Sequence, residues 1–224
     1  MDISLIVPVH NGVGLIEHLI ESLNQQKNKL KINREVIFGL DRSDDNSKEV
    51  IINNLKNWKY KIIECNNGST GLTRNDCLNV AEGKYIMFAD QDDWFIEKDV
   101  TDVLYKAIND NDYDIVEFKI KSHIQEIGEY GAAAVWRAIF SKRIIGDTRF
   151  WEEYGEDNQF SEEIWRKCGF TNGGWGGMPK YKDNPQWYRI NYTPYFYNYP
   201  RKGSLMDLKY NTWDKYQESK NNEF

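Results

Sequence analysis

The chain has 224 residues and a formal net charge of −6, and 40% of its residues are hydrophobic and 29% charged. This length and composition are typical of one soluble globular domain, and no stretch approaches the roughly 20 apolar residues that a membrane-spanning helix needs. The three cysteines match neither a zinc pattern nor a disulfide framework, and the first residues lack the features of a signal peptide, so we expect a cytoplasmic protein.

Apolar strands and amphipathic helices alternate through the first half of the chain. We predict strands over 3–9, 35–40, 59–65, 84–89 and 113–120, and helices over 14–26, 47–58, 73–83 and 99–110. The first strand is a continuous apolar run, as expected for a strand buried on both faces. Ser47 is predicted to cap the second helix, and Gly83 to close the third. This alternation predicts βαβ units and a mostly parallel sheet.

The pattern is less regular beyond about residue 125. We predict a strand over 134–145 that leads into a short turn, a helix over 155–169, a strand over 193–199 and a terminal helix over 204–217 capped at Ser204. Residues 169–181 contain five glycines and are predicted to be irregular.

Residues 178–210 carry a local charge of +4, whereas the rest of the chain sums to −10. The basic residues of this segment are interleaved with many aromatic ones. Such a segment could stack on and neutralise a sugar phosphate or a nucleic acid. It could equally be an aromatic-rich β segment whose Lys and Arg side chains are simply solvated.

Polar clusters follow three of the predicted strands, at residues 8–11, 41–47 and 90–93. Ligands of parallel sheets bind at the carboxyl ends of the strands, and these ends meet at one edge. The three clusters are therefore predicted to converge on one ligand site.

Asp90, Asp92 and Asp93 directly follow the fourth predicted strand. Carboxylates this close repel one another unless a cation lies between them. Carboxylates at positions i and i+2 can share Mg²⁺ or Mn²⁺ and leave coordination positions open for a diphosphate. The metal would neutralise the charge that develops on a leaving phosphate. The alternative is an acidic loop that caps the following helix, and the cluster alone does not decide between the two.

Residues 74–94 resemble the central signature of family 2 glycosyltransferases with the GT-A fold, Arg-Asn-x-Gly-Leu-x-x-Ala-x-Gly-x-Tyr-Ile-x-Phe-x-Asp-x-Asp-Asp. The residues in register are Arg74, Asn75, Leu78, Ala81, Gly83, Tyr85, Ile86, Phe88, Asp90, Asp92 and Asp93. Four further stretches are similar, in the expected order: the opening strand at 3–11, the second turn at 41–47, the acceptor-side segment at 135–160, and the Tyr-x-Tyr-Arg-x-x-x-Ser close at 195–206.

The chain departs from the family pattern at a few positions. Arg42 stands where glycine is usual, Leu40 replaces the first acid of the second turn, and Cys77 replaces a glycine. The segment before Arg74 is also about two residues shorter than is common. These departures bear on the choice of donor base and sugar more than on the class of reaction.

The resemblance implies a single GT-A domain over 1–224, with a mostly parallel central sheet flanked by helices. Residues 1–120 would form the nucleotide-sugar-binding half and residues 121–224 the acceptor-side half. The implied activity is a metal-dependent, inverting transfer of a hexose-type sugar from a nucleoside diphosphate, most simply a UDP-sugar, to a hydroxyl of a glycan or glycolipid precursor. Mn²⁺ or Mg²⁺ would be the cofactor.

The residues that the resemblance places around the donor are Pro8, His10, Asn11, Asp41, Arg74, Asp90, Arg201 and Ser204. Asp41 would accept a hydrogen bond from the base, although a turn residue bonded to its own backbone is the alternative. Arg74 would face the diphosphate or sugar, and Arg201 and Ser204 would contact phosphate. Asp92 would be the main metal ligand, with Asp90 and Asp93 beside it.

The resemblance makes Asp157 the general base, with Glu156 as the second choice. Both residues are also good first-turn acids for the helix that follows, because the helix dipole favours negative charge there. Weaker candidates on the acceptor side are Trp175, in a possible lid, and Trp136.

The sequence is also compatible with three other functions. The acceptor could be a modified base in DNA, which the basic and aromatic segment would suit. The enzyme could instead be a nucleotidyltransferase, which would release pyrophosphate. Lastly, the chain could bind a sugar nucleotide without turning it over.

Overall fold

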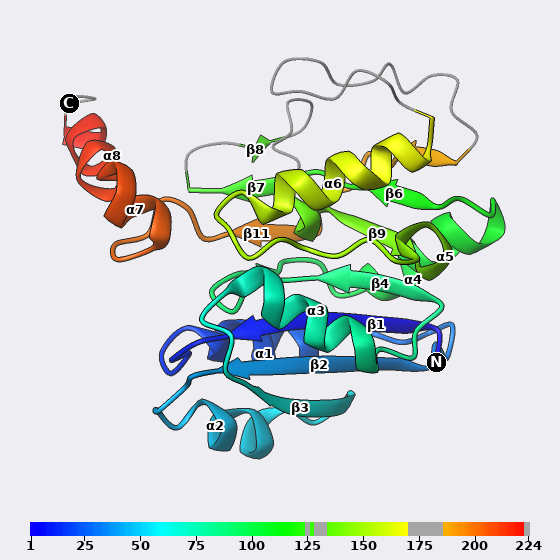
Figure 1. Ribbon diagram of the computed structural model, residues 1–224, viewed down its shortest axis with the longest axis horizontal. Helices are drawn as coiled ribbons and strands as arrows, with labels where there is room; N and C mark the ends of the chain where they lie inside the picture. Colours follow the sequence, from blue (N-terminus) through cyan, green and yellow to red (C-terminus); the bar gives the residue numbers. More distant parts are fainter. Residues whose placement is uncertain (124–125, 128–133, 170–185, 222–224) are drawn as a thin grey trace.

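A seven-stranded sheet forms the centre of the computed structural model, which describes residues 1–123, 126–127, 134–169 and 186–221 (Figure 1). Its strand order is β10-β6-β9-β4-β1-β2-β3. The strands are β1 Ile3–Val9, β2 Arg34–Asp41, β3 Lys59–Cys65, β4 Tyr85–Phe88, β6 Ile115–Glu117, β9 Ala138–Ser141 and β10 Trp187–Arg189. All pairings are parallel except those of β9, which runs antiparallel to β4 and β6. The predicted mostly parallel sheet is confirmed.

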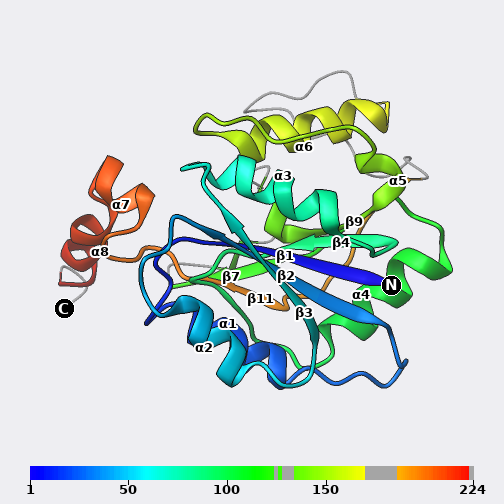
Figure 2. The same ribbon diagram turned by 60° about the horizontal axis from the view of Figure 1, so that its bottom comes forward.

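Helices cover both faces of this sheet (Figure 2). One face carries α1 Ile16–Asn24, α2 Ser47–Asn54 and α4 Val100–Asp110; the other carries α3 Thr70–Val80, α5 Lys142–Ile145 and α6 Glu156–Lys167. Each face has its own apolar core: Leu5 and Val7 of β1 belong to the first, and Ile6 to the second. Burial on both faces is why this strand reads as a continuous apolar run.

A second sheet, which the sequence analysis did not predict, has the strand order β5-β11-β7-β8. Its strands are β5 Trp94–Phe95, β7 Ile120–Ser122, β8 Glu126–Ile127 and β11 Tyr195–Tyr197. The single strand predicted over 113–120 is therefore wrong, since the chain leaves β6 in one sheet and enters β7 in the other. Strand β11 pairs with β5, so the C-terminal segment lies beside the acidic residues that follow β4.

Several predicted boundaries are corrected by the structure. The strand predicted over 134–145 is a short 3₁₀ turn (η1, Val135–Arg137), then β9, then α5. The predicted terminal helix is two helices, α7 Leu205–Tyr210 and α8 Thr212–Asn221, because Asn211 between them is left-handed, with φ 53°. Ser204 caps α7 as predicted, its hydroxyl accepting a hydrogen bond from the Asp207 amide. Among the described residues, none of the helices is both long and apolar enough to span a bilayer.

Ser47 is not the cap of α2, because Asn46 occupies that position and Ser47 is the first helical residue. The Ser47 hydroxyl instead accepts a hydrogen bond from the Gly12 amide at 2.7 Å, which ties the start of α2 to the loop after β1. Helix α3 begins and ends three residues earlier than predicted and is capped by Ser69. This earlier start carries the N-terminal end of α3 to the edge where the polar clusters meet.

Candidate active site

The loops after β1 and β2 are bonded to each other at the carboxyl edge of the sheet, where the sequence predicts a ligand site. His10 Nδ1 lies 2.8 Å from the Asp41 carbonyl oxygen. A carbonyl can only accept, so Nδ1 carries the hydrogen, and Nε2 of the neutral ring is left as an acceptor. The Asn11 amide donates to Ser43 Oγ at 3.1 Å, and Asn11 Oδ1 accepts from the Asp44 amide at 3.0 Å.

The Asp41 carboxylate is buried and holds the loop that precedes α3. Its two oxygens accept hydrogen bonds from the amides of Asn67, at 2.7 Å, and Ser69, at 3.1 Å. Asp41 therefore bonds the backbone of a loop 26 to 28 residues away and not that of its own turn, so the alternative to base recognition is not the arrangement found. Each carboxylate oxygen has a second lone pair, so a contact with a base stays compatible with these bonds and remains a prediction.

Arg42 shows why the family pattern has glycine at this position. Its φ is 51°, in the left-handed region that glycine adopts without steric cost. The guanidinium donates from Nε to Asn66 Oδ1 at 3.0 Å and from Nη2 to the Asn66 carbonyl at 3.1 Å. Asp41 and Arg42 thus both hold the loop that precedes α3, through hydrogen bonds to residues 66–69.

The acids after β4 have different partners. Asp93 is only 1% exposed; its Oδ2 accepts from the Tyr195 hydroxyl at 2.8 Å and its Oδ1 from the Asn198 amide at 2.9 Å. Burial and the neighbouring Asp92 and Asp90 raise the pKa of Asp93 well above its ordinary value. Asp93 therefore anchors the C-terminal segment around β11, and its placement does not support it as a metal ligand.

Asp90 and Asp92 are partly exposed and suit a divalent cation. Asp90 Oδ1 accepts from Arg74 at 2.7 Å, and Asp92 Oδ2 accepts from Arg201 Nε at 2.8 Å. Burial, and then the charge of Asp90, raise the pKa of Asp92, and a bound cation would relieve this repulsion. The part of the chain that the structure describes contains no group of three potential metal ligands. The hard oxygens of two carboxylates fit Mg²⁺ or Mn²⁺ when a diphosphate and water complete the coordination.

Arg74 joins the donor side to the predicted base. It projects from α3, is 2% exposed, and donates from Nη1 to Glu156 Oε1 at 2.9 Å and to Asp157 Oδ1 at 2.7 Å, while its Nη2 bonds Asp90. The family resemblance implies contact of Arg74 with the diphosphate or sugar, whereas in the structure its partners are three carboxylates. We call Arg74 and these three carboxylates the Arg74 hub. Local sequence patterns could not reveal it, because two of the carboxylates lie more than 80 residues from Arg74 in the chain.

The environment of Asp157 suits proton transfer near neutral pH. Burial, with further repulsion from Asp90 and Glu156, outweighs the attraction of Arg74 and raises the pKa of Asp157 to about 7. Its side chain nevertheless remains 22% exposed, so a substrate hydroxyl can reach it. Both acids occupy the first turn of α6, as the helix-dipole alternative expects. That alternative does not account for their shared guanidinium.

The family model for glycosyl transferase family 2 matches residues 4–161. The chain belongs to this family. Similar proteins include the poly(ribitol-phosphate) beta-glucosyltransferase of Bacillus spizizenii, 32% identical over 124 residues, and GlyA of Streptococcus pneumoniae, 31% identical over 154 residues. The matches cover 54% and 68% of this chain but only 19% and 20% of those proteins. The chain thus spans about a fifth of the length of these family members.

The fold is similar to that of TarS from Staphylococcus aureus. The crystal structure of TarS 1–349 in complex with UDP-GlcNAc aligns with a TM-score of 0.77 at 20% sequence identity, covering 92% of this chain and 61% of that one. The GT-A architecture predicted from the sequence is confirmed by this likeness.

The structure describes two of the three remaining candidate residues. Trp136 is 7% exposed and stacks on Tyr195 and Tyr197, with ring centroids 5.6 and 4.7 Å away. It packs in the core, so it is not placed to present a face to an acceptor. Ser204 serves as the cap of α7. Trp175 lies outside the described residues.

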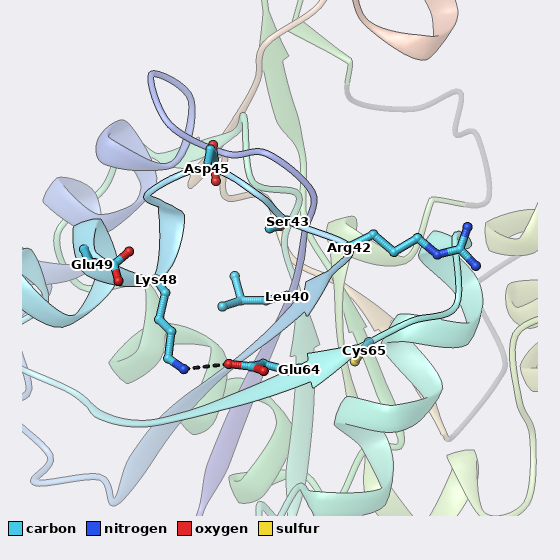
Figure 3. Close-up of a pocket in the computed structure, with 8 residues that line it drawn as sticks. All are labelled: Leu40, Arg42, Ser43, Asp45, Lys48, Glu49, Glu64 and Cys65. Carbon is cyan, nitrogen blue, oxygen red and sulfur yellow. Dashed lines mark hydrogen bonds and ion pairs between the residues drawn. The ribbon is translucent and has the colours of Figure 1, made fainter.

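A cavity of about 260 Å³ opens beside this site, between α2 and the ends of β2 and β3 (Figure 3). It is lined by Leu40, Arg42, Ser43, Asp45, Lys48, Glu49, Glu64 and Cys65. Lys48 Nζ and Glu64 Oε1 pair across it at 2.6 Å, and the Arg42 side chain extends away from the other lining residues. None of the acids that Arg74 gathers lines this cavity, so it is separate from the predicted catalytic centre.

Proposed function

We propose that the chain is a metal-dependent, inverting glycosyltransferase that moves a sugar from a nucleoside diphosphate, most simply UDP, to a hydroxyl of a glycan. The observation that carries this proposal is the Arg74 hub. A single guanidinium holds Asp90, on the donor side, and Asp157, a carboxylate whose pKa is raised to about 7, within 2.7 Å of its nitrogens. The membership in family 2 and the UDP and UDP-GlcNAc complexes of TarS support the donor class.

The proposed chemistry is one displacement. Asp157 removes the proton of the acceptor hydroxyl while that oxygen attacks the anomeric carbon, and the bond from this carbon to the diphosphate oxygen breaks. Attack from the side opposite the leaving group inverts the anomeric centre. Asp92 and Asp90 would hold Mn²⁺ or Mg²⁺, which supplies charge neutralisation at the diphosphate. Arg201, which pairs with Asp92, is placed to pair with a phosphate instead, since guanidinium groups bind both anions well.

The nucleotide would lie against the bonded loops after β1 and β2. Pro8, His10 and Asn11 border this position, and we assign base recognition to Asp41. Because the Nδ1 atom of His10 bonds the Asp41 carbonyl, its Nε2 atom is the ring nitrogen that can contact the nucleotide there.

A nucleic-acid acceptor is not favoured by the described part of the basic segment 178–210. Arg189 forms an ion pair with Glu117 at 2.6 Å, and Arg201 pairs with Asp92. Arg189 is thus neutralised within the protein, and Arg201 lies in the site beside Asp92, so neither belongs to an open basic surface that would attract phosphate backbones.

The donor and the metal can be tested together. We expect UDP with Mn²⁺ to raise the melting temperature more than UDP alone, because a ligand that binds only the folded state stabilises it. A panel of nucleotide sugars should then show slow, chelator-sensitive hydrolysis for the true donor, and Asp92→Asn should abolish the metal effect. Release of pyrophosphate would identify a nucleotidyltransferase, and full activity in chelator would refute the metal-dependent mechanism.

The rate should depend on pH through Asp157. Because the base must be ionised to accept a proton and its pKa is raised to about 7, we expect kcat/KM to fall about tenfold per pH unit below that value and to level off above it. Initial rates across the neutral range, at constant ionic strength and metal concentration, would show this limb. A profile that is flat from about pH 5 upward would contradict the assignment.

A further inference from the structure

Large exposed side chains gather where the loop before α6 meets α7. Trp151 is 59% exposed and Tyr154 is 61% exposed; Tyr210 of α7 is 45% exposed. Lys209 Nζ lies 3.9 Å from the centre of the Tyr154 ring and 5.2 Å from that of Tyr210. We call Trp151, Tyr154, Lys209 and Tyr210 the aromatic rim. The contact between Lys209 and Tyr154 joins α7 to the loop before α6, and both views show α7 on the side of the molecule where this loop lies (Figures 1 and 2).

The backbone under the aromatic rim is firmly held. The Trp151 amide donates to Gln159 Oε1 at 3.0 Å, and the Ser69 hydroxyl donates to the Glu152 carbonyl at 3.0 Å. Helix α3 comes so close that a Cβ on Gly71 would lie 2.2 Å from the Trp151 carbonyl oxygen. The rings are therefore displayed to solvent by an anchored loop, and exposed apolar groups on a fixed scaffold are typical of binding surfaces.

The aromatic rim is directly connected to the predicted base. The loop that carries Trp151 and Tyr154 runs through Gly155 into Glu156 and Asp157 at the start of α6. The same Ser69 that bonds this loop also donates its amide to Asp41 on the donor side. A molecule resting on these rings would therefore lie on the loop that leads into the predicted base.

Acidic side chains outnumber Lys209, the cation of the aromatic rim, along the loop that leads into the site, and this disfavours a polyanion. Glu152 and Glu153 lie between the two rings in the sequence and are exposed, and Glu156, Asp157 and Asp90 follow towards the centre. Aromatic faces bury the C–H face of a sugar ring, while carboxylates accept hydrogen bonds from its hydroxyls. The combination fits an uncharged polyhydroxyl ring better than a phosphate-bearing chain.

We infer that Trp151 and Tyr154 form the acceptor subsite and bind an uncharged pyranose of the acceptor glycan, with Lys209 holding the Tyr154 ring in place. This inference rests on the proposed function. It names the kind of sugar that the site accepts and the side chains that bind it.

The test compares the Trp151→Ala and Tyr154→Ala variants with the wild-type protein, all of them as the full 224-residue chain. The probes are uncharged oligosaccharides (chito-, cello- and maltotetraose) and poly(ribitol phosphate), with binding followed by saturation-transfer NMR. We expect at least one uncharged probe to bind the wild-type protein and each alanine variant to bind it roughly tenfold more weakly, the loss of one well-placed aromatic contact. Tyr154→Phe should retain binding. Tyr60→Ala, which removes a 39% exposed ring from the remote strand β3, is the matched control.

Hydrolysis of the nucleotide sugar without acceptor distinguishes failure of the acceptor-subsite inference from failure of the proposed glycosyltransferase function. The rim variants should keep the wild-type melting temperature, and Tyr60→Ala should also hydrolyse the donor at the wild-type rate. If the donor is hydrolysed but the alanine variants bind every probe as the wild type does, only the acceptor subsite is refuted. Binding of poly(ribitol phosphate) alone, or of none of the probes, would also overturn the inference. If the wild-type chain hydrolyses none of the nucleotide sugars, the proposed function is refuted instead.

Discussion

Replacing Asp157 with asparagine is expected to lower the rate of sugar transfer by about 10²–10⁴-fold while leaving donor affinity nearly unchanged. Asparagine has the same shape and can still accept the hydrogen bond that Asp157 receives from Arg74 at 2.7 Å, so the hub should survive. What is lost is the group that takes the proton of the acceptor hydroxyl. Steady-state transfer rates and UDP titrations with metal would measure the two effects separately.

Glu156→Gln is the matched control for this prediction. Glu156 bonds the same Arg74 nitrogen at 2.9 Å and is exposed to a similar extent, at 18% against 22%. We expect its substitution to cost much less activity than that of Asp157. A larger loss of activity in Glu156→Gln than in Asp157→Asn would instead identify Glu156 as the general base. Unchanged turnover in Asp157→Asn would mean that no base acts here, as in a protein that only binds sugar nucleotides.

Replacing Arg74 with methionine is expected to lower the free energy of unfolding by about 3–5 kcal/mol, because removal of one partner leaves buried charges uncompensated. Three carboxylates share this guanidinium, so its loss leaves them facing one another in a largely buried site. Urea denaturation of the folded chain would give the value. Arg166→Met is the control: Arg166 is 64% exposed and its ion pair within the described residues is with Glu162 one helical turn away, so a change below about 0.5 kcal/mol is expected.

The cost of losing Arg74 should depend on pH. Burial and neighbouring acids raise the pKa of Asp157 to about 7 against the attraction of Arg74, so loss of the guanidinium raises this pKa further above its value in the unfolded chain, and the folded variant binds more protons. Its stability relative to the wild type should therefore improve as pH falls and worsen as pH rises through neutrality. Equal destabilisation at acidic and alkaline pH would show that lost packing, not unpaired charge, dominates.

The order of strands and helices in the first half could be predicted from the sequence, because each element there carries its own signal. Apolar runs of strand length alternate with amphipathic helices, and βαβ geometry then brings residues 8–11, 41–47 and 90–93 to one edge. The sheet β5-β11-β7-β8 could not be predicted in this way. Its strands are two or three residues long, too short for a hydrophobic period, and β11 pairs with β5 across about a hundred residues of chain.

The sequence by itself determined the family, the fold class and the candidate acids, since these depend on local patterns and spacing. Only the tertiary structure decided what each acid does. Asp92 and Asp93 are adjacent and chemically identical, yet Tyr195 and Asn198, over a hundred residues later, bind Asp93 and leave Asp92 partly exposed beside Arg201. Arg74 likewise gathers acids from the turn after β4 and from α6, because burial of its charge requires partners that only folding brings within reach.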